Sequence, residues 1–328
     1  MRILPLFIPH QGCPFSCIYC NQYSITKADS ETKRDFKGLI ADFCSQKIIE
    51  EKEIAFFGGT FTALDIDSQI EYLNLIKPYL SDIKGIRIST RPDCINAEKL
   101  IFLKKSGVTT IELGIQSFDN LVLKASKREY SADKAVNACN SVTEFGFELV
   151  IQLMPGLPED TLDTYLKSIN KAISLHPQGL RLYPTIVLKQ TVLEKWYLKG
   201  DYTPISLTEA INWLKISIIK CRKAEVNIIK MGLHSDIKPS DIVAGPYHPA
   251  LGELVRIDLL YDKLIDNWQS SKTLVIPIRW KSLFLGHQRL LIKKLKDKLL
   301  LDKIAVRINK DKEAVEYSFD ESIAQYIW

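Results

Sequence analysis

Short apolar runs alternate with longer segments of helical periodicity, and this alternation constrains the fold more than any other feature of the chain. Six runs are predicted to be strands: residues 2–9, 54–57, 85–90, 108–115, 147–154 and 180–183. The predicted helices between them cover about 30–49, 67–80, 97–106, 131–145 and 159–174, the first capped by Asp29 or Ser30. Such alternation predicts an α/β fold with a parallel sheet covered by helices. Six units of this kind fit an incomplete (β/α)6 barrel.

Barrel enzymes work from the C-terminal ends of their strands, so the residues at those ends are the informative ones. Directly after the first strand comes Cys13-Pro14-Phe15-Ser16-Cys17-Ile18-Tyr19-Cys20. Thiolates this close on one loop can bind a single soft metal centre. Three are too few for a structural zinc site, and the spacing differs from the Cys-x2-Cys-x2-Cys run of bacterial ferredoxins. The motif suits a [4Fe–4S] cluster with one open iron; a zinc site completed by His10 and unliganded thiols are the alternatives.

The spacing Cys-x3-Cys-x-aromatic-Cys, with Tyr19 as the aromatic residue, resembles the signature of the radical S-adenosylmethionine (SAM) enzymes. The resemblance implies a partial TIM-type barrel and a [4Fe–4S] cluster held by Cys13, Cys17 and Cys20, with SAM on the open iron. It further implies that one electron from the cluster cleaves SAM to methionine and a 5′-deoxyadenosyl radical, which abstracts hydrogen from a substrate. A reductase, a flavodoxin or a ferredoxin would supply that electron.

The same resemblance implies SAM contacts at the ends of later strands. Gly58-Gly59-Thr60 matches the family's Gly-Gly-Glu element, with Thr60 in place of the glutamate. Gln116 resembles the residue that hydrogen-bonds the SAM ribose, and Arg128 resembles the arginine that pairs with the SAM carboxylate. Further contacts are expected at Ser89, where related families carry glutamate, at Gln152, and at Ile186 beside the adenine. Arg91 is expected either to bind a substrate anion or to lie at the barrel rim.

Residues 112–202 resemble the radical SAM domain of the Elongator catalytic subunit, a tRNA-modifying enzyme, and the likeness covers roughly residues 1–232. That subunit also carries an acetyltransferase domain, which needs a glycine-rich loop for acetyl-CoA. Beyond Gly252 the only glycine is Gly286, so we expect this sequence to lack that domain. Coproporphyrinogen-dehydrogenase-like chemistry on a small molecule is the alternative within the class. A non-catalytic protein that binds RNA or carries a cluster is the alternative outside it.

The chain changes character near residue 272. Residues 272–312 hold twelve Lys and Arg and three Asp and Glu, a net charge of +9 in a chain whose total is +5. We predict a barrel core at 1–232 and a small α+β extension at 233–328, with a strand at 273–278, a basic helix at 282–298 and a hairpin of 304–308 with 314–318. The basic residues of this helix either bind RNA phosphates, such as those of tRNA, or form a solvated face: Arg289, Lys293, Lys294, Lys296 and Lys298. Trp280, Phe284 and His287 either stack on bases or fill a small core.

The composition predicts a cytoplasmic protein without a membrane partner. No apolar run reaches the roughly 18 residues expected of a membrane span. Seven cysteines in a sequence that shows no secretory leader are typical of reduced thiols. His234 and Asp236 follow a predicted last strand at 227–232, and they are either substrate contacts or plain loop residues.

Overall fold

The computed structural model describes residues 2–26, 35–47, 49–233, 237–268, 273–310, 315–318 and 323–326. The chain divides into two compact units, Met1–Pro249 and Ala250–Trp328. The sequence analysis placed the change at 232/233, but the segment that follows contributes β9 (Ile242–Ala244) to the first unit. There β9 pairs antiparallel with β7 (Val187–Leu188). Among the described residues, no helix is long and apolar enough to cross a membrane.

Seven parallel strands form the sheet of the first unit, and their order in space equals their order in the chain. They are β1 (Arg2–Phe7), β2 (Lys52–Phe57), β3 (Gly85–Thr90), β4 (Val108–Gln116), β5 (Glu148–Leu153), β6 (Gly179–Leu182) and β8 (Asn227–Met231). A doubly wound sheet would reverse its strand order midway, whereas a barrel adds each strand at the same edge. The predicted partial barrel is therefore confirmed, with β8 as a seventh strand.

Pro5 is tolerated in β1 because β1 lies at the edge of the sheet. Its register partner is Ala55 of β2, and proline is found in sheets mainly on edge strands, where the missing N–H does not break the ladder. The next strand inward is fully apolar at its centre, since Ile54, Ala55 and Phe56 are wholly buried. Burial on both faces is what a parallel strand covered by helices requires.

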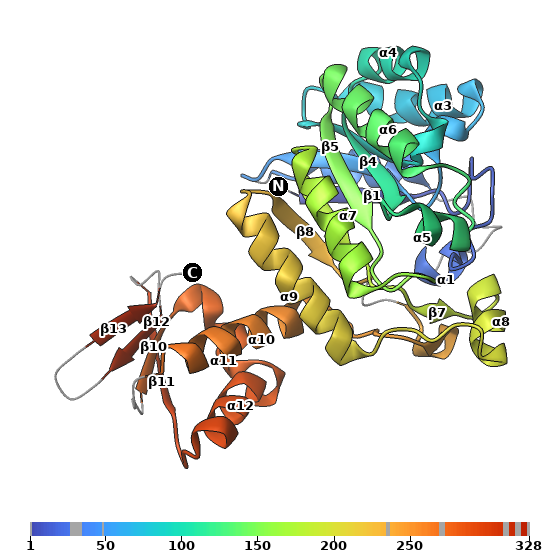
Figure 1. The fold of residues 1–328 in the computed structure, drawn as a ribbon. Helices are drawn as coiled ribbons and strands as arrows, with labels where there is room; N and C mark the ends of the chain where they lie inside the picture. Colours follow the sequence, from blue (N-terminus) through green and yellow to red (C-terminus); the bar gives the residue numbers. More distant parts are fainter. Residues whose placement is uncertain are drawn as a thin grey trace. The chain divides into compact units, whose positions relative to one another are not determined.

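Helices cover one face of this sheet, as Figure 1 shows for α3 (Ile66–Ile76), α4 (Ala97–Lys105), α6 (Ala132–Glu144), α7 (Leu162–Ser174) and α9 (Leu207–Lys223). Polar caps set where several of them begin. Asn96 accepts from Lys99 N at the start of α4, and Ser206 and Glu209 form a capping box on α9. Helix α7 begins at Leu162 and not at the predicted Glu159, because Thr161 is its N-cap and Glu159 has φ of +65°.

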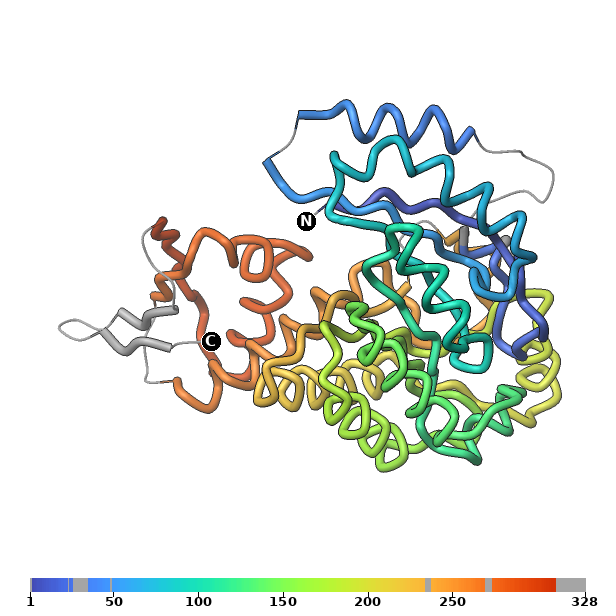
Figure 2. The backbone as a smooth tube through the Cα atoms, turned by 90° about the horizontal axis from the view of Figure 1, so that it is seen from above, coloured from blue at the N-terminus to red at the C-terminus, as the bar shows by residue number. Residues whose placement is uncertain are grey.

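The first predicted helix is shorter than expected in the part of the chain that the structure describes. Helix α2 (Phe36–Ser45) starts after Asp35, whose carboxylate accepts from Gly38 N; the predicted caps Asp29 and Ser30 lie outside the described residues. In Figure 2, α2 runs beside α3. The ring centroids of Phe36 and Tyr72 are 6.0 Å apart where the two helices meet.

The second unit has its own core. Its elements are α10 (Leu251–Asp266), β10 (Thr273–Pro277), α11 (Lys281–Leu285), α12 (Leu290–Leu299), β11 (Ala305–Asn309), β12 (Val315–Ser318) and β13 (Ile323–Tyr326). The predicted basic helix 282–298 is broken between α11 and α12, because His287, Gln288 and Arg289 all have positive φ. The predicted hairpin of 304–308 with 314–318 is also wrong: β10 lies between β11 and β12, and β12 pairs with β13.

Two of the three residues that were expected either to stack on bases or to fill a small core contribute to this core. Phe284 is wholly buried among Leu260, Leu274 and Leu291, and Trp280 packs against the same cluster. His287 lies against the carboxylate of Glu253. The core-filling alternative therefore describes Phe284 and Trp280.

Candidate functional site

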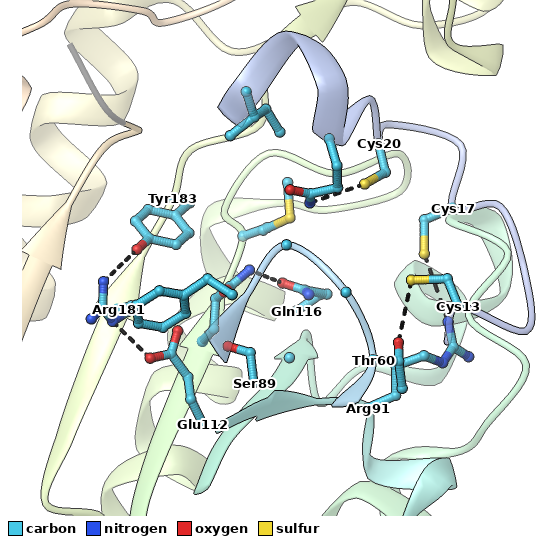
Figure 3. Close-up of a pocket in the computed structure, with 18 of the residues that line it drawn as sticks. Cys13, Cys17, Cys20, Thr60, Ser89, Arg91, Glu112, Gln116, Arg181 and Tyr183 are labelled. Atoms are coloured by element: carbon cyan, nitrogen blue, oxygen red, sulfur yellow. Dashed lines mark hydrogen bonds and ion pairs between the residues drawn. The ribbon is translucent and has the colours of Figure 1, made fainter. Parts of the chain in front are cut away.

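A cavity of about 350 Å³ opens at the C-terminal ends of the strands of the first unit. It is lined by the three cysteines and by all the residues that the family resemblance assigned to SAM: Cys13, Cys17, Tyr19, Cys20, Gly58, Gly59, Thr60, Ser89, Gln116, Arg128, Gln152 and Ile186. Its size is within the range typical of small-molecule sites. Figure 3 shows the three cysteines along one side of this cavity.

The cysteine loop joins β1 to the short helix α1 (Gln22–Thr26) and is anchored at both ends. His10 Nε2 accepts a hydrogen bond from Gln22 N at 2.9 Å, which closes the loop. Among the described residues, no three His, Cys, Asp or Glu side chains are close enough to hold a single metal ion. Neither observation supports the zinc alternative with His10 as a ligand. Three separated thiols around one cavity suit a larger cluster, whose cysteines bind different iron atoms.

Each of the three thiols has a polar side chain beside it. The Thr60 hydroxyl lies 3.3 Å from Cys13 Sγ, and Gln22 Nε2 donates to Cys20 Sγ at 3.3 Å. Arg128 Nη1 donates to Cys17 Sγ at 3.1 Å, and Arg91 Nη1 lies 3.7 Å from the same sulfur. Donors and cations beside sulfur favour the thiolate form that binds metal. The residues present therefore fit an iron–sulfur cluster.

Burial favours the neutral thiol over the thiolate at Cys13 and Cys20. It raises the pKa of the Cys20 thiol to about 12 and also raises the pKa of Cys13. A metal ligand must be deprotonated, so ligation here would release protons.

Arg128 is a buried cation with a fixed orientation. Its Nε donates to the Tyr130 hydroxyl at 2.9 Å, its Nη2 donates to Gly114 O, and its Nη1 contacts Cys17. Tyr130 in turn donates to Ile115 O at 2.9 Å. Among the described residues these contacts use three of the five guanidinium N–H bonds, which leaves two for a ligand.

The Gly-Gly-Thr turn after β2 supports the cysteine loop. Gly58 has φ of +89°, and a Cβ on Gly59 would lie 2.5 Å from Gln11 O and 2.7 Å from Ile8 O. Only glycine allows this close approach. The Thr60 N–H donates to Gln11 O at 2.9 Å, so this amide already has a partner within the protein.

The remaining predicted residues lie around the same cavity. Gln116, whose φ is +70°, accepts from Gln152 Nε2 at 3.2 Å through its side-chain oxygen. Ile186 is part of an apolar cluster with Leu188. The hydroxyl of Tyr19 is buried and has no hydrogen-bond partner among the described residues. His234 and Asp236 lie outside the described residues.

Arg91, whose role the sequence left open, lies close to Cys17. Its Nε and Nη2 donate to the two carboxylate oxygens of Asp93 at 2.9 and 2.8 Å. Its guanidinium also lies over the Phe15 ring, 5.1 Å from the centroid. These contacts hold a second cation next to the cysteine loop.

The sequence analysis missed a set of charged residues on the inner face of the sheet. Arg181 Nε lies 2.9 Å from Glu112 Oε2, and Arg181 Nη1 donates to the Tyr183 hydroxyl at 2.9 Å. Burial raises the pKa of Glu112, against the opposing effect of Arg181 and Arg87. The sequence did contain a signal for this set, because it places charged residues within otherwise apolar parallel strands. Glu and Arg are seldom fully buried without a partner, so such residues are expected to pair.

Comparison with known proteins identifies the family of the chain. The model of the radical SAM superfamily matches residues 7–172, and that of a radical SAM C-terminal domain matches residues 177–260. The tRNA uridine(34) acetyltransferase of Dehalococcoides mccartyi is 28% identical over 231 residues, covering 58% of this chain and 50% of that protein. The heme chaperone HemW of Bacillus subtilis is 30% identical over 196 residues, covering 57% of this chain and 52% of that protein.

A solved structure shows the same fold. The archaeal Elp3 of Methanocaldococcus infernus superposes with a TM-score of 0.59 at 24% identity, covering 65% of this chain and 55% of that one. The chain spans about half the length of these curated relatives. The match to the family model covers half of the sequence. The chain therefore belongs to the radical SAM superfamily, whose enzymes use a [4Fe–4S] cluster and SAM.

Proposed function

We propose that Cys13, Cys17 and Cys20 hold the [4Fe–4S] cluster of this radical SAM enzyme and that the adjoining cavity binds SAM and substrate. The observation that carries the proposal is the convergence of the three thiols on one cavity, each with its own polar side chain. When bound, the cluster supplies one electron that cleaves SAM, and the resulting 5′-deoxyadenosyl radical abstracts hydrogen from the substrate.

The residues around the cavity bind SAM and orient it. The two remaining N–H bonds of Arg128 bind the SAM carboxylate. This contact costs little conformational entropy, because three contacts already fix the guanidinium before SAM binds. Gln116 and Gln152, joined by their own hydrogen bond, contact the ribose. The backbone and hydroxyl at Gly58, Gly59 and Thr60 form the side next to the methionine group, and Ser89 adds a neutral contact. Tyr19 and Ile186 exclude water from the cluster and the adenine.

We propose tRNA as the substrate. Two observations support this: the similarity to proteins named as tRNA uridine(34) acetyltransferases, and the basic surface of the second unit. On α12, Lys293 and Lys298 are exposed, and Arg307 of β11 is exposed as well. Exposed cations suit phosphate contacts. An external reductase, flavodoxin or ferredoxin supplies the electron in the cytoplasm.

A small-molecule substrate is the second candidate, because a heme chaperone is as similar to the chain as the tRNA enzymes are. One experiment separates the two. The protein is reconstituted anaerobically with iron and sulfide, reduced with dithionite, and assayed for 5′-deoxyadenosine with SAM, with and without bulk tRNA.

We expect 5′-deoxyadenosine formation that rises when tRNA is added and vanishes in Cys17→Ala. Cys94→Ala is the matched control, because Cys94 is also half-buried but does not line the cavity. Formation that does not respond to tRNA would eliminate the RNA substrate and favour a small molecule. A four-iron protein that forms no 5′-deoxyadenosine would contradict the proposal in favour of a non-catalytic role.

A further inference from the structure

The end of the cavity farthest from the cysteines has chemistry that the cluster and SAM do not use. Figure 3 shows Tyr183, Arg181 and Glu112 on the side opposite Cys13 and Cys17. The cavity lining also includes Phe7 and Phe57. We call the part of the cavity bounded by Phe7, Phe57, Glu112, Arg181 and Tyr183 the inner chamber.

The charges of Glu112 and Arg181 in the inner chamber, and those of the neighbouring pair Glu53 and Arg87, cancel. Arg181 Nε lies 2.9 Å from Glu112 Oε2, and Arg87 Nε donates to Glu53 Oε2 at 2.8 Å. A 3.9 Å approach of Arg87 to Glu112 links the two pairs. Two buried guanidiniums thus face two buried carboxylates. A ligand with a net charge would leave one charge uncompensated away from water, so this balance favours a neutral ligand.

The same residues present an acceptor and a donor to a ligand. Glu112 lines the cavity, and its Oε2 is buried 2.9 Å from Arg181 Nε, so Arg181 holds the carboxylate beside the chamber as an acceptor. The Tyr183 hydroxyl accepts from Arg181 Nη1 at 2.9 Å, so its own proton is left for another acceptor.

The walls of the inner chamber favour a flat ligand. The Phe7 and Phe57 ring centroids are 6.3 Å apart, and the Arg181 guanidinium lies 5.2 Å from the centroid of Phe57. Aromatic faces and guanidinium planes are the surfaces on which unpaired bases stack.

We infer that the inner chamber binds a neutral, planar ring through an N–H next to a C=O, as in the lactam edge of uracil. Glu112 accepts from the ring N–H, and the Tyr183 hydroxyl donates to the carbonyl. Arg181 positions both of these groups and neutralises Glu112. This inference rests on the proposed function, because it assigns the target base of the RNA substrate to particular residues. It also disfavours a substrate that would place carboxylates in the inner chamber, such as a porphyrin with propionate groups.

The test is equilibrium binding of uridine and 3-methyluridine to the reconstituted protein with SAM present and no reductant. The two nucleosides differ only at ring N3, where a methyl group in 3-methyluridine replaces the N–H whose hydrogen bond Glu112 is expected to accept. Uridine should bind at least tenfold more tightly than 3-methyluridine. Tyr183→Phe should weaken uridine binding about tenfold, and Glu112→Gln should reduce the discrimination between the two ligands. Tyr165→Phe is the matched control, since the Tyr165 hydroxyl is bonded to Ser217 on the helical layer and does not line the cavity.

Equal binding of the two nucleosides, no uridine binding, or a Tyr183→Phe variant that binds like the wild type would each overturn the inference. Should Glu112→Gln fail to fold, Tyr183→Phe and the methylated ligand still decide the question. Because no SAM is cleaved, this result is separate from that of the 5′-deoxyadenosine assay. Stimulation by tRNA without uridine discrimination would leave the proposed function standing and remove only the inner-chamber assignment.

Discussion

Replacing Arg87 with methionine tests how strongly a buried ion pair stabilises the first unit. Arg87 Nε donates to Glu53 Oε2 at 2.8 Å, and both side chains are only 1% exposed. Methionine removes the charge and leaves the Glu53 carboxylate buried, with the Thr110 hydroxyl at 2.9 Å as its hydrogen-bond partner. Loss of one member of a buried pair costs about 3–5 kcal/mol, because the remaining charge is uncompensated.

We therefore expect Arg87→Met to lower the free energy of unfolding by about 3–5 kcal/mol. Combining it with Glu53→Gln should restore most of this loss, because no unpaired charge then remains. Hydrogen exchange of peptides from β2, β3 and β4 is the suitable assay, since these peptides report on the first unit alone. The control is Lys167→Met, which removes a surface pair with Asp163 and should leave exchange in these strands unchanged.

Two results would refute the reasoning. One is an Arg87→Met variant in which the free energy of unfolding, measured by hydrogen exchange, falls by less than about 1 kcal/mol, the effect expected of an exposed ion pair. The other is a double variant that loses the sum of the two single effects. Additivity would mean that the two charges do not interact in the folded state.

Three further predictions concern SAM, pH and RNA. Arg128→Met should weaken SAM binding about 10–100-fold, as measured by equilibrium dialysis, because the variant lacks the guanidinium that pairs with the SAM carboxylate. Iron analysis should show the wild-type iron content. A SAM affinity equal to that of the wild type would contradict the placement of the carboxylate at Arg128. Burial raises the pKa of Asp160 to about 6, above its value in the unfolded chain. The folded state therefore binds the Asp160 proton more tightly than the unfolded chain does. This proton stabilises the folded state by at most about 3 kcal/mol, fully below about pH 4, and the stabilisation is lost as the pH rises through about 6. Urea unfolding at several pH values should show a fall over this range that Asp160→Asn lacks, and parallel profiles would contradict it. Lys293→Gln with Lys298→Gln should reduce the slope of log Kd for tRNA against log salt by about one per lost phosphate contact. The exposed Lys199→Gln serves as the control, and an unchanged slope in the double variant would exclude α12 from the RNA interface.

The sequence alone was sufficient for the elements whose causes are local. The strand at 85–90 agrees with β3, because apolar residues flanked by turns define a buried strand wherever it lies. The cysteine spacing predicted the loop at the end of β1, and the family resemblance identified residues that all line one cavity. Such features depend on neighbours in the chain, so they can be predicted without the fold.

The tertiary structure decided what depends on residues far apart in the chain. The pattern at 304–308 and 314–318 predicted a hairpin, but β10 takes the position between β11 and β12, a choice made by strand pairing and not by turn chemistry. Local periodicity also predicted one continuous basic helix, whereas positive φ at residues 287–289 divides it, with Phe284 packed into the core on one side of the break.

The inner chamber is the clearest case. Glu112 and Arg181 stand on β4 and β6, and each is an isolated charge in an apolar strand when read in sequence. Only the curl of the parallel sheet brings their side chains to one cavity, where each neutralises the other. The sequence by itself thus determined the strands, the cysteine loop and the superfamily. The packing of the sheet decided which charges meet, because the free energy of a buried charge depends on the partner that the fold places beside it.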